Sequence, residues 1–491
     1  MKKVLAFDFG ASSGRAILGT LDNGKITLEE IHRFSNDPVE VNGHFYWDAL
    51  RLFFEIKQGI LKCSSLGHKD IAAIGIDTWG VDFGLIDKDG ELLANPYHYR
   101  DAKVENMEET CVELGKEDIY EKTGLQFLAF NTLYQLRNLK KTKPELLDRA
   151  EHLLLMPDLF NYFLTGKLAA EYSNVSTTQL LNPNKGKWEF SLTDKLGIDR
   201  KLFSNIVDSG TVLGTLKPEI AKELQIPEVP VICVASHDTG SAVASVPFDD
   251  PEHSLYISCG TWSLMGTELR HPLISKEAMD FNFTNEGGVE RTTRFLSNIM
   301  GLWLIQESRR QWKRENLDYS FNDMENAARA AEPFRSFINP DFAGFTPPGD
   351  MPSRIKEFNK NAGLKVPETM GDVVLCIYQS LALKYRYVTE SMEKLMGRKI
   401  DTIHMVGGGI KDKFLCQMAA DATGRRVVAG PVEATAMGNI AVQFMALGDI
   451  KGLDGVRKTI KASAETCEYL PSGNADWDAA FEVFKKTCLN V

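Results

Sequence analysis

The sequence lacks the features that would assign it to several specialised classes of protein. It has no concentrated run of Lys or Arg and a net charge of −11, so we expect neither nucleic acid nor an anionic membrane as a partner, because both require clustered cations. No apolar run approaches the length of a transmembrane helix, and Asp8 interrupts the first apolar stretch too early for a signal peptide. We therefore expect a cytoplasmic protein.

Cysteine is present, but not in a pattern that binds metal. The eight cysteines are scattered singly, without C-x-x-C spacing or a nearby pair of histidines. This argues against a zinc site and favours reduced, mostly buried thiols. Low-complexity tracts are absent too, and with 43% apolar and 25% charged residues the composition is that of an ordinary globular protein. Its 491 residues suffice for two or three domains.

The hydrophobic periodicity indicates an α/β architecture that is duplicated along the chain. In the N-terminal part it predicts a strand, a glycine turn, a strand, a hairpin turn, a strand, a helix and a buried strand. From Ser254 the plan returns as a strand, a turn at Gly260–Thr261 and a strand, and from Thr402 as a strand, a triple-glycine turn, a helix and a strand. Residue identity between the halves is negligible, so only the architecture is repeated.

A domain boundary is expected at residues 247–253, which contain two prolines and three acids and have the composition of a hinge. This predicts an N-terminal domain at residues 1–246 and a C-terminal domain at residues 254–491. A single large domain with an ordinary loop is the alternative. Locally, we expect a hairpin that turns at Asp89–Gly90, and a surface loop at residues 341–367, which are rich in Pro, Gly and Asn.

The glycine turn between Asp8 and Arg15 leads into a strand rather than a helix, so it is neither a Rossmann fingerprint nor a P-loop. Its backbone N–H groups and serine hydroxyls can surround a phosphate, while Asp8 can hold a divalent cation through water and Arg15 can meet an anion. A plain turn is the alternative. Cys259–Trp262 occupies the corresponding turn of the second half, and the bare backbone of Gly407–Gly409 can lie against a ligand. Together these segments indicate a nucleotide cleft between duplicated domains.

Acidic residues follow a predicted strand near residue 77. Asp77 ends the apolar run of residues 71–76, where the carboxyl end of a strand faces a cleft; a helix or turn cap is the alternative. Residues 79–82 read Trp-Gly-Val-Asp and combine an aromatic face, bare backbone and an acid. That combination suits a polyol, although a tryptophan in a hairpin is most often part of the core.

Asp238 stands in a run of small and apolar residues, Val-Ala-Ser-His-Asp-Thr-Gly-Ser-Ala-Val-Ala, at residues 234–244. It lies between a predicted strand and a predicted helix, where a carboxylate serves as an N-cap. It can equally be the base of a phosphoryl transfer, which asks little basicity because the transition state is loose. His237 and Thr239 supply donors beside it, and the small residues after it leave room for a substrate. The local pattern does not separate a cap from a base.

The same motifs occur, in this order, in a known family. From about residue 4 to about residue 448 the sequence closely resembles the rhamnulokinases of the FGGY family of carbohydrate kinases. The resemblance rests on the motifs DFGASSGR, GIDTWGVDFGLID, NTLYQLRNL, LLMPDLFNYFLTGK, VASHDTGSAV, SCGTWSLMG, NEGG, NIMGLWLIQ, HMVGGG and AGPVEATAMGNIAVQ. It implies an α/β fold of two actin-like, ribonuclease-H-like domains around a catalytic cleft, with sugar on the N-terminal domain and ATP on the C-terminal one.

The resemblance also implies an activity and a set of site residues. The activity is Mg²⁺- and ATP-dependent phosphorylation of L-rhamnulose on its 1-hydroxyl, and Asp238 matches the proton acceptor. The positions that match sugar contacts are Gly80, His237, Thr239 and Asn298. Those that match ATP contacts are Ala11, Ser12, Ser13, Gly14, Arg15, Thr261, Gln306 and Gly408. Asp8 and Asp77 fall where related kinases place acids near Mg²⁺ and the phosphates.

Two other functions stay open. The first is the same phosphoryl transfer to another ketose, such as L-fuculose or L-xylulose. In a different class, the chain is a non-catalytic actin-fold ATP switch or sugar sensor, which would consume ATP slowly and without a response to sugar. A base at Asp238 with a full set of substrate contacts favours the kinase, because a sensor needs no base.

Overall fold

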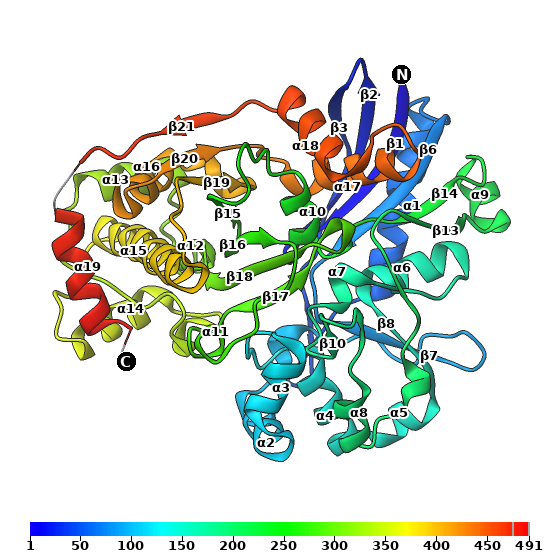
Figure 1. The fold of residues 1–491 in the computed structure, drawn as a ribbon, viewed down its shortest axis with the longest axis horizontal. Helices are drawn as coiled ribbons and strands as arrows, with labels where there is room; N and C mark the ends of the chain where they lie inside the picture. Colours follow the sequence, from blue (N-terminus) through cyan, green and yellow to red (C-terminus); the bar gives the residue numbers. More distant parts are fainter. Residues whose placement is uncertain (474–475, 490–491) are drawn as a thin grey trace. The chain divides into compact units, whose positions relative to one another are not determined.

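The computed structural model describes residues 1–473 and 476–489 and divides into two compact units (Figure 1). Unit 1 comprises Met1–Pro247, Glu268–Leu296 and Glu433–Ala464, and unit 2 comprises the rest of the described chain. Two segments of the C-terminal half therefore pack in unit 1. The predicted hinge, and the predicted division of sugar and ATP between the domains, stay predictions.

The centre of unit 1 is a six-stranded sheet with the order β13-β14-β6-β1-β2-β3. Its strands are β1 (Lys2–Phe9), β2 (Ser13–Asp22), β3 (Lys25–Ser35), β6 (Ile71–Thr78), β13 (Thr211–Thr215) and β14 (Pro230–Cys233). Strand β6 runs parallel to both β1 and β14, and the other pairs are antiparallel. Asn23 and Gly24 have φ angles of 49° and 76° in the β2–β3 turn, as a tight hairpin of this kind requires, so the predicted hairpin is confirmed.

The remaining elements of unit 1 surround this sheet. The short strands pair as β4 (Val39–Val41) with β5 (His44–Tyr46), β7 (Phe83–Asp87) with β8 (Ala150–Leu155), β9 (Ala170–Glu171) with β12 (Ile206–Val207), and β10 (Leu181–Asn182) with β11 (Lys187–Trp188). Strands β17 (Thr284–Gly287) and β18 (Thr293–Met300) pair with each other and belong to the seven-stranded sheet that contains β15 (Ser254–Cys259). Strand β18 passes from unit 1 into unit 2 after Leu296. The helices are α1 (Ala49–Ser65), α2 (Val104–Leu114), α3 (Lys116–Thr123), α4 (Thr132–Thr142), α5 (Pro144–Arg149), α6 (Met156–Thr165), α7 (Tyr172–Val175), α8 (Phe190–Lys195), α9 (Pro218–Leu224), α10 (Asp238–Ala244), α11 (Lys276–Asp280), α17 (Ala434–Ala446) and α18 (Gly452–Ser463).

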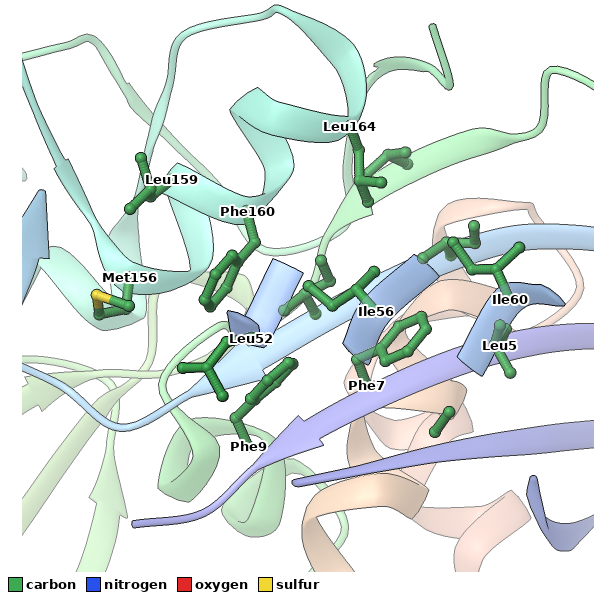
Figure 2. Close-up of a cluster of buried hydrophobic side chains, with 14 of the residues drawn as sticks. Leu5, Phe7, Phe9, Leu52, Ile56, Ile60, Met156, Leu159, Phe160 and Leu164 are labelled. Atoms are coloured by element: carbon green, nitrogen blue, oxygen red, sulfur yellow. The ribbon is translucent and has the colours of Figure 1, made fainter. Parts of the chain in front are cut away.

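Strand β1 is buried on both faces, and its side chains alternate between two cores. Phe7 and Phe9 point toward the face covered by helices α1 and α6, as Figure 2 shows. Val4 and Ala6 lie in the core on the opposite face, together with residues of α17 and α18. By the same alternation Asp8 belongs to the α17 face, at the carboxyl end of the strand. The fold thus directs this acid toward the start of α17.

Unit 2 repeats the central plan of unit 1. Strand β15 (Ser254–Cys259) forms an antiparallel hairpin with β16 (Trp262–Leu269) and runs parallel to β19 (Thr402–Val406), as β1 does with β2 and β6. Strands β20 (Arg426–Ala429) and β21 (Cys467–Tyr469) extend this sheet, and the helices are α12 (Trp303–Arg314), α13 (Phe321–Ala330), α14 (Met351–Asn361), α15 (Met370–Met396), α16 (Lys413–Thr423) and α19 (Asp476–Thr487). The predicted duplication is confirmed. Within the described residues, no helix combines the length and the apolar character needed to cross a bilayer.

Of two local predictions, one is confirmed in reduced form and one is wrong. The chain turns at Asp89–Gly90 and pairs antiparallel across the turn through the bridge of Ile86 with Leu92, and Leu93 N donates to Leu85 O at 2.9 Å. The residues after the turn form no full strand, and the strand partner of β7 is β8 from far along the chain. Part of the loop expected at residues 341–367 is helix α14. Asp350 caps this helix by accepting a hydrogen bond from Ser353 N, and Pro352 sits in its first turn, where proline is tolerated because no backbone donor is needed there.

Candidate functional site

The carboxyl ends of adjacent strands in unit 1 bring the predicted acids together. Asp8 on β1 lies in register with Asp77 on the parallel strand β6. Beyond β6, Thr78 forms a bridge with His237, and Thr78 N donates a hydrogen bond to Ser236 O over 2.9 Å. The turn that carries Asp238 therefore begins beside the end of β6, as expected for parallel strands that end at one edge of a sheet.

Arg15, at the end of the glycine turn of residues 10–14, contacts two acids. Its Nη2 donates to Asp8 Oδ2 at 2.5 Å, and its Nη1 forms an ion pair with Glu433 at the start of α17. Burial disfavours the charge of Arg15, but the two carboxylates outweigh this effect and raise its pKa. Burial also raises the pKa of Asp8, which Arg15 opposes. The predicted anion-binding cation is thus present, held between two acids in unit 1.

The turn itself, residues 10–13, is fixed by its own backbone and by Asn36. Gly10 N donates to Ser13 O at 3.0 Å, and Asn36 donates through Nδ2 to Gly10 O at 2.8 Å and through its backbone N–H to Ser12 O at 3.1 Å. A Cβ on Gly14 would overlap the ring of Phe34, so glycine at this position is required by packing.

Asp77 is fully buried, and only one of its two carboxylate oxygens accepts a hydrogen bond. Asn439 of α17 donates through Nδ2 to Asp77 Oδ2 at 2.5 Å, whereas no described residue hydrogen-bonds to Oδ1. Burial raises the pKa of Asp77 well above its usual value, and the nearby charges of Asp8 and Asp238 raise it further. Three carboxyl groups at one edge of the sheet therefore interact electrostatically.

Asp238 is the first residue of α10, and His237 is the N-cap residue. The alternative of an Asp238 N-cap is wrong in detail, because the carboxylate accepts from the next residue: Thr239 donates through N and Oγ1 to Asp238 Oδ1, at 2.6 and 3.1 Å. His237 Nε2 lies 3.4 Å from the same oxygen. Hydrogen bonds from the described residues leave Oδ2 unused, and the side chain is 29% exposed. Burial raises the pKa of Asp238, and His237, Thr239 and Arg294 oppose the rise.

His237 is in turn oriented by a buried ion pair. Its Nδ1 lies 3.1 Å from Arg294 Nη2 and 3.3 Å from Glu286 Oε2, and Arg294 and Glu286 contact each other at 3.1 Å. The Arg294 side chain is fully buried, and its Nε donates to Gly287 O. His237 therefore has its ring fixed from β17 and β18 while its other nitrogen faces Asp238.

Trp79 and Asp82 belong to the core, so the suggestion that they form a sugar-facing pair is wrong. The Trp79 ring stacks on Trp47 with centroids 3.8 Å apart, and it is only 5% exposed. Asp82 is fully buried and accepts from the indole N–H groups of both tryptophans, at 2.6 and 3.0 Å. Of residues 79–82, only Gly80 is half-buried, and the other three are buried.

The predicted ATP contacts of the second half gather around one turn of unit 2. Thr261 lies in the β15–β16 turn, and its carbonyl accepts from the N–H groups of Gly301 and Trp303. Gly408 follows β19, the parallel neighbour of β15. Gln306 lies one turn inside α12, which begins at Trp303. Asn298, predicted to contact sugar, lies on β18 in unit 2.

Comparison with known proteins identifies the family. A model of the N-terminal domain of the FGGY family of carbohydrate kinases matches residues 3–244, and a model of the C-terminal domain matches residues 255–447. The chain belongs to the FGGY family of carbohydrate kinases. It is similar to the rhamnulokinase of Bacteroides thetaiotaomicron, with 45% identity over 98% of each chain, and to the rhamnulokinase of Bacillus subtilis, with 38% identity over 99% of each.

Solved structures of other kinases share the fold of this chain. The xylulose kinase of Lactobacillus acidophilus superposes with a TM-score of 0.82 at 18% identity, and the glycerol kinase of Plasmodium falciparum with a TM-score of 0.79 at 16% identity. Each superposition covers 99% of this chain and 97% of the other. The predicted two-domain kinase fold is confirmed.

The residues of this FGGY kinase fit a magnesium ion that is shared with a substrate. The described part of the chain has no group of three side chains arranged to hold a metal by itself. Mg²⁺, however, is usually held by one or two carboxylates together with phosphates and water. Asp77 Oδ1, a buried carboxylate oxygen without a partner among the described residues, lies beside Asp8, and this pair of acids fits that kind of site.

The sequence motifs did not reveal the segment that connects these strand ends. Glu171, which is fully buried, accepts hydrogen bonds from Ser236 through both N and Oγ, at 3.0 and 2.7 Å. Asn174 donates through Nδ2 to Trp79 O at 3.3 Å and to Ser236 O at 3.4 Å. The only signal in the sequence is an unusual density of hydroxyl and amide side chains at residues 171–179, which by composition alone is typical of a loop.

Proposed function

We propose that this FGGY kinase transfers the γ-phosphoryl group of ATP to the 1-hydroxyl of L-rhamnulose and releases L-rhamnulose 1-phosphate and ADP. Support for the substrate comes from relatives named rhamnulokinase, which are 38–45% identical over nearly the whole chain. Support for the chemistry comes from Asp238, whose position at the edge of the sheet is the observation that carries the proposal.

Asp238 acts as the base in this proposal. Thr239 fixes one carboxylate oxygen, so the other is directed toward the attacking hydroxyl. The oxygen of that hydroxyl forms a bond to the γ-phosphorus, the bond from the γ-phosphorus to the β–γ bridging oxygen breaks, and the proton passes to Asp238. A carboxylate suffices because the proton leaves late in a loose transition state. Burial, which raises the pKa of Asp238, strengthens it as a base.

Arg15 and the N–H groups of residues 11–14 offset the negative charge of the moving phosphoryl group. Arg15 is already held between Asp8 and Glu433, so a phosphate would meet a pre-positioned guanidinium. Asp8 and Asp77 would hold Mg²⁺, which when bound neutralises phosphate charge. Both acids lie at the carboxyl ends of β1 and β6, beside the turn that carries Asp238.

The proposal assigns the sugar to the N-terminal domain and ATP largely to the C-terminal one. Gly80, His237 and Thr239, with Asn298, would contact the ketose. The turn of residues 11–15, together with Thr261, Gln306 and Gly408, would contact ATP. The Thr261 turn has the same hairpin plan as the Asp8–Arg15 turn, which supports a role of both turns at the phosphates.

Ketose-dependent release of ADP tests the proposal. The purified chain is assayed with Mg²⁺ and ATP on a panel of L-rhamnulose, L-fuculose and L-xylulose, and the product is located by ³¹P and ¹³C NMR. We expect the highest kcat/KM for L-rhamnulose and phosphate on O1. A preference for another ketose would replace the substrate, and ATP consumption that no sugar stimulates would overturn the kinase in favour of a sensor.

A further inference from the structure

The turn of residues 79–82 is strained at one position. Val81 has a φ angle of 68°, in the left-handed region where a β-branched residue is a genuine outlier. Residues in such conformations persist only when their surroundings hold them there, and they gather at functional sites. Val81 directly follows Gly80, the predicted backbone contact of the ketose, so whatever holds Val81 also sets the direction of Gly80.

Two hydroxyl groups hold Val81 from both sides. Its N–H donates to Thr177 Oγ1 at 2.9 Å, and its carbonyl accepts from Thr132 Oγ1 at 2.7 Å. The hydroxyl of Thr177 donates in turn to Asn174 O at 2.8 Å, which leaves a lone pair directed at Val81. Thr177 is 5% exposed, so water does not replace this bond.

Thr177 also packs against Gly80. A Cβ placed on Gly80 would lie 2.8 Å from both Cγ2 and Oγ1 of Thr177, closer than real Cβ contacts. The bare backbone at this position is therefore imposed by Thr177 itself. The same side chain supports Gly80 by packing and Val81 by a hydrogen bond.

We propose that Thr177 is a positioning residue of the ketose site, which keeps Val81 in its strained conformation and thereby sets the backbone of Gly80 against the sugar. This inference rests on the proposed function and deepens it. Thr177 does not touch the reacting atoms, and it acts through Gly80. Asn174, in the same segment, ties the turn to Ser236, so the positions of Gly80 and of the Asp238 turn are linked through residues 174–177.

Thr178 provides a matched control next along the chain. It is fully buried, and its hydroxyl donates to Val175 O, three residues back, as the hydroxyl of Thr177 does to Asn174 O. Its Oγ1 accepts from Leu180 N at 3.1 Å, inside its own loop. A Thr178→Val variant therefore loses the same kind of hydroxyl without a bond to the strained turn.

The experiment compares Thr177→Val, Thr177→Ser and Thr178→Val with the wild type. For each protein, kcat and the KM values for ketose and ATP are measured by coupled ADP release, and the unfolding midpoint by circular dichroism. We expect Thr177→Val to lose roughly 10- to 100-fold in kcat/KM for the ketose, because small misplacements of a binding group are costly, with the KM for ATP unchanged. Thr177→Ser should recover most of the loss. Thr178→Val should keep wild-type ketose kinetics.

Ketose kinetics of Thr177→Val equal to wild type would overturn the inference. So would equal losses in Thr177→Val and Thr178→Val that affect ketose and ATP alike, since these indicate general destabilisation. Failure of the proposed function looks different: the wild type itself would show no release of ADP that depends on L-rhamnulose. If the wild type prefers another ketose, the variants are measured on that sugar.

Discussion

Removal of the Glu171 carboxylate should destabilise the protein by an amount that the structure lets us estimate. Glu171 is fully buried at the end of β9. Its Oε2 accepts from the backbone N–H groups of Ser173, Asn174 and Ser236 at 3.0 to 3.2 Å, and from the hydroxyls of Ser173 and Ser236. Ser209 Oγ donates to Oε1 at 2.7 Å. The hydroxyls can rotate toward other acceptors, but the three backbone donors cannot.

In a Glu171→Ala variant these three buried N–H groups lose their acceptor. Each unsatisfied donor costs about 1–3 kcal/mol, so the expected loss is about 3–9 kcal/mol. This is comparable with the whole stability of a typical domain, about 5–15 kcal/mol. In Glu171→Gln the amide oxygen still accepts from the N–H groups, and the amide nitrogen can donate to Ser209 Oγ. We expect this variant to lose only about 1–3 kcal/mol, the difference between charged and neutral acceptors.

The measurement is urea unfolding of wild type, Glu171→Gln and Glu171→Ala, followed by circular dichroism. We expect the midpoints to fall in that order, with Glu171→Ala partly unfolded without denaturant at 37 °C. Ketose-dependent activity of Glu171→Gln should persist, because Ser236 keeps its acceptor. A free energy of unfolding for Glu171→Ala within about 0.5 kcal/mol of wild type, the scale of an ordinary surface substitution, would refute the reasoning from unsatisfied donors.

Two further changes test burial and close packing. Burial raises the pKa of Asp82 to about 7, so the folded state keeps a proton that the unfolded state releases, and the contribution of Asp82 to stability should fall by about 4 kcal/mol from about pH 4 to about pH 7. Over this window the free energy of unfolding of the wild type should therefore decrease relative to that of Asp82→Asn. A Cβ on Gly438 of α17 would overlap the backbone oxygen of Ser241 on α10. Gly438→Ala should therefore lose about 1–3 kcal/mol or more and, by displacing α10, lower ketose turnover, which unfolding and steady-state assays measure.

Each of these two expectations has a clear counter-result. Equal pH dependence of wild type and Asp82→Asn would mean that Asp82 is not the group that titrates in this window. For Gly438→Ala, a wild-type melting temperature together with wild-type turnover would show that α10 and α17 can separate without cost.

The strand ends of the site could be predicted because they follow from local pattern. Asp77 ends an apolar run that is long enough to be a buried strand, Asp238 follows another such run after two residues, and parallel strands bring such residues to one edge of a sheet. Asp8 is predicted from its place at the start of the glycine turn after the first strand. These three acids, and the turn that carries Arg15, needed no knowledge of contacts distant in sequence.

The supporting residues could not be predicted because their roles depend on distant contacts. Thr177 meets Val81 across 96 positions, and Asn174 meets Trp79 across 95. Nothing in the local pattern at residues 171–179 indicates these partners. Trp79 shows the opposite failure: its sequence neighbourhood suits a sugar contact, and only the position of Trp47 in the fold places its ring in the core.

Comparison of wild type with Asp238→Asn tests the central claim most directly. Asparagine keeps the shape of the side chain and an oxygen for Thr239, but it cannot take the proton of the attacking hydroxyl. Calorimetry should show that the variant still binds L-rhamnulose and ATP, while ketose-dependent ADP release falls by a factor on the order of 10² to 10⁴, the usual contribution of a general base. Binding with near-normal turnover would contradict the assignment of Asp238 as the base.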